Sequence, residues 1–379
     1  MRLTENQKTI RDLAAGFASG KIEPRADEIE KAESFPQDLF DEMAKIGLIA
    51  IPFPEEYGGL NMGQEENVVA IEEISSASAS AGTILAVTQL PLDAILLYGS
   101  KEQKETYLPA GLKGDFIGSF AFTEAETGSD PKQLTTVAKK TDEGKYLISG
   151  TKRFISNASY EGPMIIFAKE ADTEECTAFI IDKFCKGYSL SNAWEKVGLQ
   201  GSHIYDVFLD EVEVTEERVL GNHGQGFDIL IGTTAYGKLA ISAVFTGTMN
   251  GSYKQAVKYA KEKMHRGKPI AKFPTIQTKI AQISANTLSA RLMLYDAAFE
   301  ADNNKEDIRS VQYHTALLKG YVADLAIDTN VLSMNVLASY GVTSEYKVER
   351  FVRDSLIAPN IEGSADIQRL IAGNYILRN

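Results

Sequence analysis

The sequence predicts an α+β protein with three domains: an N-terminal helical domain, a middle antiparallel β-domain and a C-terminal four-helix bundle. Its 379 residues exceed what one small core needs, and at about 150 residues per domain they suggest two or three domains. Apolar residues recur with a 3.6-residue period at both ends, whereas short β-branched runs fill the middle. We place the domains at residues 1–117, 118–226 and 227–379.

The N-terminal domain is predicted to be helical throughout. Residues 4–7 have the pattern of a capping box, and Pro36 starts a further helix at a position that tolerates proline. Residues 101–109 suggest a short charged helix that stops at Pro109. The uncharged run 74–92 is rich in Ser and Thr, so we interpret it as a buried helix and not as a membrane span.

The middle and C-terminal domains are predicted from changes in the spacing of apolar residues along the chain. Short β-rich runs separated by Gly, Asp and Glu predict a small antiparallel sandwich or barrel, at 135–138, 145–150, 164–168, 177–181 and 210–214. Long helical patterns then return and predict about four helices of a bundle, at 227–263, 276–302, 306–339 and 346–375.

Composition excludes several classes of function. A net charge of -13 argues against binding nucleic acid, which requires clustered Lys and Arg. Cys176 and Cys185 are too few for a disulfide framework, and the four histidines lack metal-ligand spacing, so we expect no metal site. The first residues lack the apolar core of a signal peptide and are not acid-poor like a transit peptide, so we expect a cytoplasmic protein.

Five motifs occur in order along the chain, and together they resemble the acyl-CoA dehydrogenase family from end to end. The last of them contains Glu362, followed by Gly363 and Ser364. The motifs are Tyr107–Pro109 with 118–124 and 127–130, then 152–157, 196–202, 221–227 and 361–369.

The resemblance implies an FAD-dependent enzyme that oxidises an acyl-CoA thioester to the trans-2-enoyl-CoA. The reaction removes a proton from Cα and a hydride from Cβ, and the hydride requires a redox cofactor because side chains do not accept it reversibly. The resemblance further implies an electron-transfer flavoprotein as acceptor. It also implies a homotetramer or homodimer, because family members bind FAD across a subunit interface.

The resemblance also assigns residues to the flavin. Phe122 and Thr123 would contact the ring, Gly128 would let the backbone approach the cofactor, and Ser129 would lie near flavin phosphate or thioester. The remaining ring and cofactor contacts are assigned to Phe154, Ser156 (with its hydroxyl near N5) and Ser364.

Glu362 is the implied catalytic base. A carboxylate can remove a Cα proton only if desolvation raises its basicity and the enolate is stabilised. Its backbone N–H and a ribityl hydroxyl would hold the thioester carbonyl, Gly363 would allow the tight backbone path, and Ile361 would border the acyl group. Two alternatives stay open: Glu362 is an ordinary acid before a helix, and Lys238 is either a residue of the thioester end or a solvated lysine.

Some positions depart from the family pattern, mostly at the adenosine diphosphate end of FAD. Lys263 and Arg266 stand near the expected Arg and Phe-Gly, and could bind pyrophosphate in another way. The expected Gln and Gly-Gly pair are replaced by Pro274 and by Ala338 and Ser339. Phe154 and Ile361 replace residues that are often aromatic, which could alter the acyl group accepted.

Two other functions remain open from the sequence. A flavoenzyme of the same fold could act on an acyl group carried by a protein, or could pass electrons to oxygen. A non-catalytic, flavin-poor relative with a binding role is the other class, and its support is the altered adenosine end.

Overall fold

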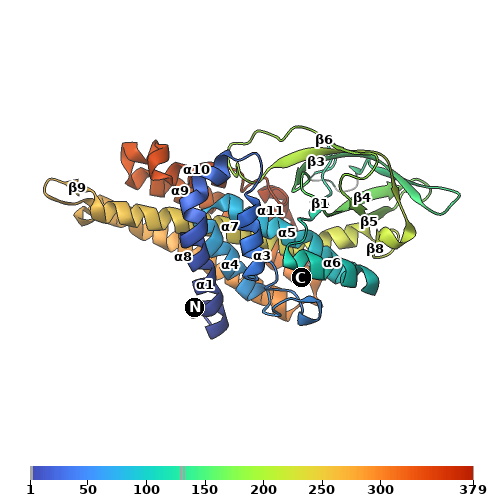
Figure 1. Cartoon of the computed structure of the whole chain (residues 1–379). Helices are drawn as coiled ribbons and strands as arrows, with labels where there is room; N and C mark the ends of the chain where they lie inside the picture. Colours follow the sequence, from blue (N-terminus) through green and yellow to red (C-terminus); the bar gives the residue numbers. More distant parts are fainter. Residues whose placement is uncertain (1–2, 129, 131–132, 379) are drawn as a thin grey trace.

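The fold places helices from both ends of the chain around one another and the β-domain at one end of the molecule (Figure 1). A computed structural model describes residues 3–128, 130 and 133–378. Thr4 caps the first helix with the predicted capping box to Gln7. The N-terminal helices are α1 Glu5–Phe17, α2 Ala26–Lys31, α3 Gln37–Lys45, α4 Gln64–Ala77, α5 Ala79–Tyr98 and α6 Lys101–Lys113, with helical turns at Ala18–Ile22, Glu23–Arg25 and Glu55–Tyr57.

The prediction that a helix stops at Pro109 was wrong. Helix α6 continues through Pro109 and ends at Gly114, whose left-handed φ of 82° forms the C-cap. Leu108 and Leu112 lie on either side of the proline and are both buried. Burial of this face offsets the hydrogen bond that proline cannot donate.

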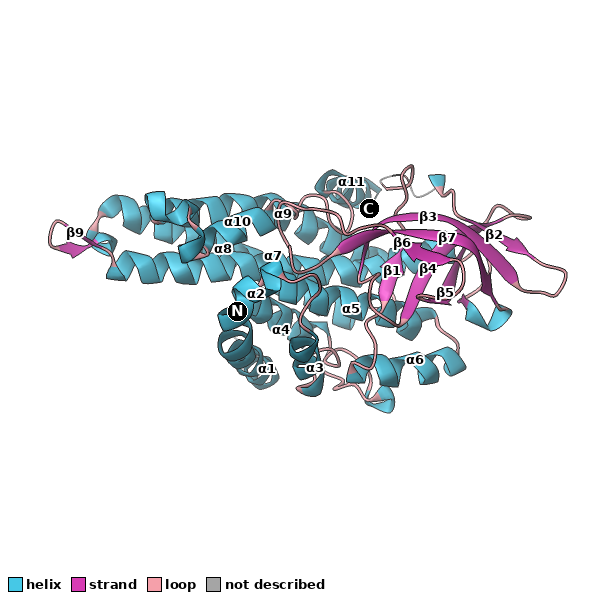
Figure 2. Ribbon diagram, turned by 45° about the horizontal axis from the view of Figure 1, so that its top comes forward, coloured by secondary structure: helices cyan, strands magenta, loops and turns pink. Residues whose placement is uncertain are grey.

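The β-domain is one curved sheet of mixed pairing (Figure 2). Most strand pairs are antiparallel, as predicted, but β1 and β2 both pair with β4 in parallel, which the sequence did not indicate. The strand order is β6-β7-β3-β2-β4-β5-β8, with β1 beside β4. The strands are β1 Ser119–Ala121, β2 Val137–Lys140, β3 Tyr146–Ser156, β4 Pro163–Glu170, β5 Cys176–Asp182, β6 Tyr188–Leu190, β7 Ile204–Val214 and β8 Val219–Leu220.

The C-terminal domain contains three long helices, as predicted, but the fourth predicted helix is divided. Helices α10 and α11 are separated by the loop 356–364, which carries Glu362. The α7–α8 connection forms a short hairpin of β9 and β10 that projects from the end opposite the β-domain (Figures 1 and 2). The elements are α7 Gly226–Glu262, β9 Met264–His265, β10 Lys268–Pro269, α8 Pro274–Asn303, α9 Ile308–Val336, α10 Val348–Ser355 and α11 Ala365–Arg378, with helical turns at Ile270–Lys272, Ala338–Val342 and Ser344–Tyr346.

The centre of the molecule is built from helices of both helical domains. Helices α5 and α7 are long and apolar enough to cross a membrane, yet 83% of the apolar window in each is buried inside the fold. The run 74–92 is buried, as predicted, but it is not one helix: Ser78, the N-cap of α5, separates the end of α4 from α5, and α5 continues to Tyr98. A side chain at Gly247 of α7 would come within 2.5 Å of Ser75 of α4, so these helices pack in close contact.

Candidate active site

Glu362 lies in the loop between α10 and α11, with its carboxylate against α7. A Cβ atom at Gly237 of α7 would lie 2.8 Å from Oε2 of Glu362 and 3.0 Å from Leu90 of α5. The backbone of Glu362 has a φ of 54°, which is uncommon for a residue with a side chain. The loop therefore directs this carboxylate into the junction of α5 and α7.

Two buried lysines surround the carboxylate. Burial raises the pKa of Glu362, while the positive charges of Lys238 and Lys319 oppose this rise. Burial also lowers the pKa of both Lys238 and Lys319 to about 8, against the effect of Glu362. Burial thus makes Glu362 a stronger base, and the two lysines partly offset the rise of its pKa.

Lys238 is not a solvated helix lysine, so that alternative was wrong. Its side chain is only 4% exposed, and its Nζ donates a 2.5 Å hydrogen bond to Oε1 of Gln312 on α9. The ammonium group is thereby held inside the bundle near the base. The thioester-end role stays a prediction.

The residues on either side of Glu362 shape its loop. Gly363 has a φ of 80°, and a Cβ atom there would overlap the side chain of Gln368. Gln368 donates from Nε2 to the carbonyl oxygen of Glu362 at 3.3 Å. Ser364 accepts a 3.4 Å hydrogen bond from Ile367 at the start of α11, and Ile361 packs against the main core. The roles of Ile361, Gly363 and Ser364 toward ligands stay predictions.

The predicted flavin turn and the second flavin strand lie side by side. The backbone N–H of Arg153 donates a 2.7 Å hydrogen bond to the carbonyl of Thr123, and the Phe122 ring packs edge-on against Phe167 at 5.5 Å. Among the residues that the structure describes, a Cβ atom at Gly128 would meet no atom within 4 Å. Ser129 lies outside the described residues.

Phe154 projects from a β-bulge in β3. The pairing of β3 with β7 shifts between Lys152 and Ile155, and Phe154 has a φ of 58°. Its ring is 49% exposed and packs at 5.3 Å against Trp194. Ser156 regains the regular pairing, opposite Ile204. The bulge therefore presents an aromatic ring beside the turn that follows β1.

Helix α5 connects the flavin turn to the base. A Cβ atom at Gly118, just before β1, would lie 2.8 Å from Pro91 of α5. The preceding residue, Leu90, lies against Gly237 together with Glu362. The structure thus brings residues from three distant segments to the same turn of α5.

Sequence reasoning missed a buried ion pair beneath the flavin turn. Nζ of Lys152 lies 2.6 Å from Oε1 of Glu124, and both side chains are at most 1% exposed. Lys152 also donates to the carbonyl of Phe167 at 2.6 Å, and Glu124 accepts hydrogen bonds from Thr135 and Thr136. Although burial acts in the opposite direction, Lys152 lowers the pKa of Glu124 to about 2. Glu124 and Lys152 each lie within one of the five motifs, but the motifs do not indicate that the two side chains pair with each other.

Lys263 and Arg266 lie at the opposite end of the molecule. Helix α7 rises 1.5 Å per residue, so Lys263 is about 37 Å from Lys238. Lys263 sits over the Tyr340 ring at 4.7 Å, and Arg266 forms the hairpin turn with a φ of 48°. Ala338 has a φ of 52° near this end, a conformation that glycine adopts more easily. Within one chain these residues do not join the ring site.

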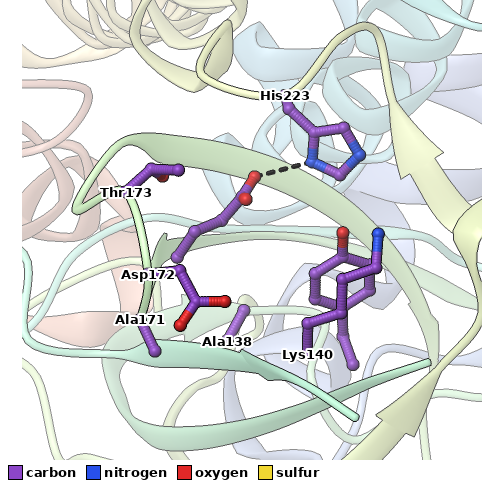
Figure 3. A pocket seen from close by; sticks show the side chains of 8 residues that line it. Ala138, Lys140, Ala171, Asp172, Thr173 and His223 are labelled. Atoms are coloured by element: carbon purple, nitrogen blue, oxygen red, sulfur yellow. Dashed lines mark hydrogen bonds and ion pairs between the residues drawn. The ribbon is translucent and has the colours of Figure 1, made fainter. Parts of the chain in front are cut away.

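A separate polar cluster lines a cavity of about 330 Å³ in the β-domain (Figure 3). His223 lies between two carboxylates, with Nδ1 2.6 Å from Glu170 and Nε2 2.6 Å from Glu216. Burial lowers the pKa of His223, but the hydrogen bonds to both acids outweigh it and raise the pKa. The cluster joins the connection before α7 to the end of β4 and to the turn after β7, so we assign it a structural role.

Known families match nearly the whole chain. Residues 4–115, 119–212 and 224–377 match the N-terminal, middle and C-terminal domains of acyl-CoA dehydrogenase. An acyl-CoA dehydrogenase of Bacillus subtilis (strain 168) is 35% identical over 381 residues, which cover 100% of this chain and 99% of the relative. A helical fold with a central β-domain and a half-buried glutamate near the C-terminus, whose carboxylate lies against α7, thus define a flavin-dependent class. The chain belongs to the acyl-CoA dehydrogenase family.

Solved structures agree with this assignment. Butyryl-CoA dehydrogenase from Megasphaera elsdenii superimposes with a TM-score of 0.94 at 28% identity, covering 100% of both chains. An acyl-CoA dehydrogenase complexed with FAD from Bacillus anthracis has a TM-score of 0.93 at 27% identity, covering 99% of this chain and 68% of that one. The predicted fold class is confirmed, and FAD is the cofactor of the family.

The residues around the flavin turn fit this cofactor. Oγ1 of Thr127 is buried and has no hydrogen-bond partner among the described residues. No described atom lies within 4 Å of where a side chain at Gly128 would begin, and the ring of Phe154, in the same β-domain, is exposed. An orphaned hydroxyl, an open backbone and a free aromatic ring are what a planar, polar cofactor requires.

Proposed function

We propose that this protein oxidises an acyl-CoA thioester to the trans-2-enoyl-CoA, with Glu362 as the base. The observation that carries the proposal is the Glu362 carboxylate, which lies against α7 between two buried lysines. An ordinary acid before a helix would face solvent, whereas this one is directed into the junction that also supports the flavin turn.

The chain's own residues account for the proton transfer. Glu362 takes the proton from Cα of the thioester, and the electron pair of that bond moves toward the carbonyl. Gly237 leaves room for the carboxylate to lie against α7, because any side chain there would collide with it. Lys238 and Lys319 supply positive charge near the developing enolate. When bound, FAD supplies the acceptor for the hydride of Cβ.

An anaerobic spectrum with a panel of acyl-CoAs tests the proposal. We expect the flavin absorbance of the purified protein to bleach with saturated acyl-CoAs, most completely with one chain length. A protein that holds FAD but is bleached by no thioester of the panel would contradict the proposal. The same panel offered as carrier-protein thioesters, and a repeat in air, distinguishes the carrier-bound and oxygen-using alternatives.

Electron-transfer flavoprotein is the proposed acceptor. A subunit of the caffeyl-CoA reductase–Etf complex of Acetobacterium woodii is 32% identical over 384 residues, which cover 100% of both chains. Its name also indicates that relatives run the reaction toward the saturated thioester, for which the same carboxylate would return the proton to Cα. We further propose a role in fatty acid metabolism and a cytoplasmic location.

The charges of the chain favour a homo-oligomer, a tetramer or a dimer. Residues 254–279 carry eight basic side chains and one acidic one, in a chain of net charge -13. We name this projecting end, which includes the hairpin, the basic arm. A second copy offers it an acidic surface and, by the family's pattern, the pyrophosphate of FAD. We propose that Lys263 and Arg266 reach the FAD of that second copy.

An exposed apolar face supports the same association. Helix α8 exposes three large apolar side chains, Leu288, Leu292 and Phe299. Beside them, the hydroxyl groups of Ser289 on α8 and Tyr321 on α9 form a 3.0 Å hydrogen bond. A hollow of about 450 Å³ lies along this face of α8 beside Leu292 and Phe299. Exposed apolar patches of this kind mark interaction sites.

Removal of the two arm charges should weaken FAD binding. For the double variant Lys263→Gln/Arg266→Gln we expect FAD affinity to fall at least about 100-fold, because each charge-assisted hydrogen bond is worth about 1.5–3 kcal/mol and two are lost. The matched control is Lys139→Gln/Lys305→Gln, which removes two exposed lysines that lie outside the basic arm. The measurement is FAD titration at two salt concentrations, with light scattering for the oligomeric state. Unchanged affinity, or a monomer that retains FAD, would contradict the proposal.

A further inference from the structure

Lys319 holds both ends of the loop that carries the base. Its Nζ donates a 2.6 Å hydrogen bond to the carbonyl of Gly363 and a 3.4 Å one to the carbonyl of Pro359. The side chain is 2% exposed, so these bonds form out of water. The ammonium group therefore bridges the two ends of the loop 359–363 around Glu362, beside the 2.8 Å backbone hydrogen bond from the N–H of Ala365 to the carbonyl of Pro359.

Side chains of helix α9 contact both the base loop and α7. Gln312, seven residues before Lys319 on the same face of α9, accepts the hydrogen bond from Lys238. At the residue directly after Lys319, Arg369 of α11 donates to the carbonyl of Gly320 at 2.9 Å. Helix α9 thus fixes α7, the base loop and the start of α11 relative to one another.

The backbone of the base loop needs such a support. Glu362 and Gly363 have successive positive φ values of 54° and 80°. A left-handed residue with a side chain is held in place only when its surroundings determine it. Besides Lys319, two hydrogen bonds hold this turn: Gln368 donates to the Glu362 carbonyl at 3.3 Å, and the N–H of Ala365 donates to the carbonyl of Pro359 at 2.8 Å. Of the three, only the Lys319 contact also brings a charge to the turn.

We propose that Lys319 is a positioning residue for the base: its ammonium group brackets the loop 359–363, keeps the Glu362 carboxylate against α7 and supplies positive charge beside it. The inference rests on the proposed function, because it gives Lys319 its role through Glu362. The charged groups around the base are Lys238 of α7 and Lys319 of α9, and those around Lys319 are Arg369 of α11 and Asp324 of α9.

The pH dependence of flavin reduction tests the inference. Glu362 acts as a carboxylate, so the rate falls as pH drops through its pKa. Loss of the Lys319 charge removes an influence that lowers this pKa, so the acidic limb of Lys319→Met should move up by about one pH unit. We also expect the limiting rate to fall about 10- to 100-fold because the carboxylate is less well placed. Binding of the acyl-CoA should stay unchanged.

Three further variants sharpen the test. Lys319→Arg keeps the charge and should retain the acidic limb of the wild type, whereas Lys305→Met, in the exposed turn before α9, should change nothing. If Lys319→Met does not fold, Lys319→Gln gives the same comparison with a neutral donor. If Lys319→Met or Lys319→Gln keeps the wild-type acidic limb and the wild-type limiting rate of flavin reduction, while Glu362→Gln is inactive, this inference alone is overturned. An active Glu362→Gln would overturn the proposed function itself.

Discussion

Glu362→Gln should reduce the rate of flavin reduction by an acyl-CoA about 100- to 10,000-fold, because general-base catalysis contributes about that much. The variant leaves the shape of the side chain nearly unchanged. Its amide fits the space beside Gly237 and Leu90, so the fold and FAD content should stay the same. The measurement is anaerobic stopped-flow absorbance at saturating substrate.

The design separates the loss of a base from a general disturbance of the loop. Asp366→Asn, in the exposed first turn of α11, is the matched control and should react at the wild-type rate. Glu362→Gln should still bind substrate, and binding should perturb the flavin spectrum without bleaching it. If the variant bleaches as fast as the wild type, Glu362 is not the base.

The sequence predicted the class of the fold because the period of its apolar residues changes at each domain. The prediction of one helix over 346–375 overlooked Pro359 and Gly363, two residue types that commonly end a helix. What the sequence could not show is the path of the loop between α10 and α11, where Lys319, far away in the sequence, binds the carbonyls of Pro359 and Gly363. Contacts of this kind leave no periodic signal.

The candidate site shows the same division. Glu362 and Phe154 were predicted from motifs, and the structure adds their unusual backbone conformations. Lys319 was missed because one lysine in an apolar helix resembles a solvent-facing residue until its neighbours are known. A lone lysine between Leu318 and Gly320 was the signal that could have drawn attention to it.

Lys152→Met should destabilise the β-domain and release FAD. The substitution leaves Glu124 as a buried charge without its partner, for which the expected loss is about 3–5 kcal/mol. We expect the melting temperature to fall by about 5–10 °C. Scanning calorimetry, with the flavin-to-protein ratio measured on the same samples, checks both effects. The control is Lys139→Met, an exposed lysine of β2, which should melt like the wild type.

A second substitution separates the ion pair from simple packing. In Lys152→Met/Glu124→Gln no uncompensated charge remains, so the double variant should regain part of the lost stability. It should not regain FAD, because Lys152 also donates to Phe167 and, at 3.4 Å, to Phe122 of the flavin turn. If Lys152→Met melts like the wild type, the pair does not stabilise the fold. If the double variant binds FAD normally, the turn is positioned by its backbone bond to Arg153 alone.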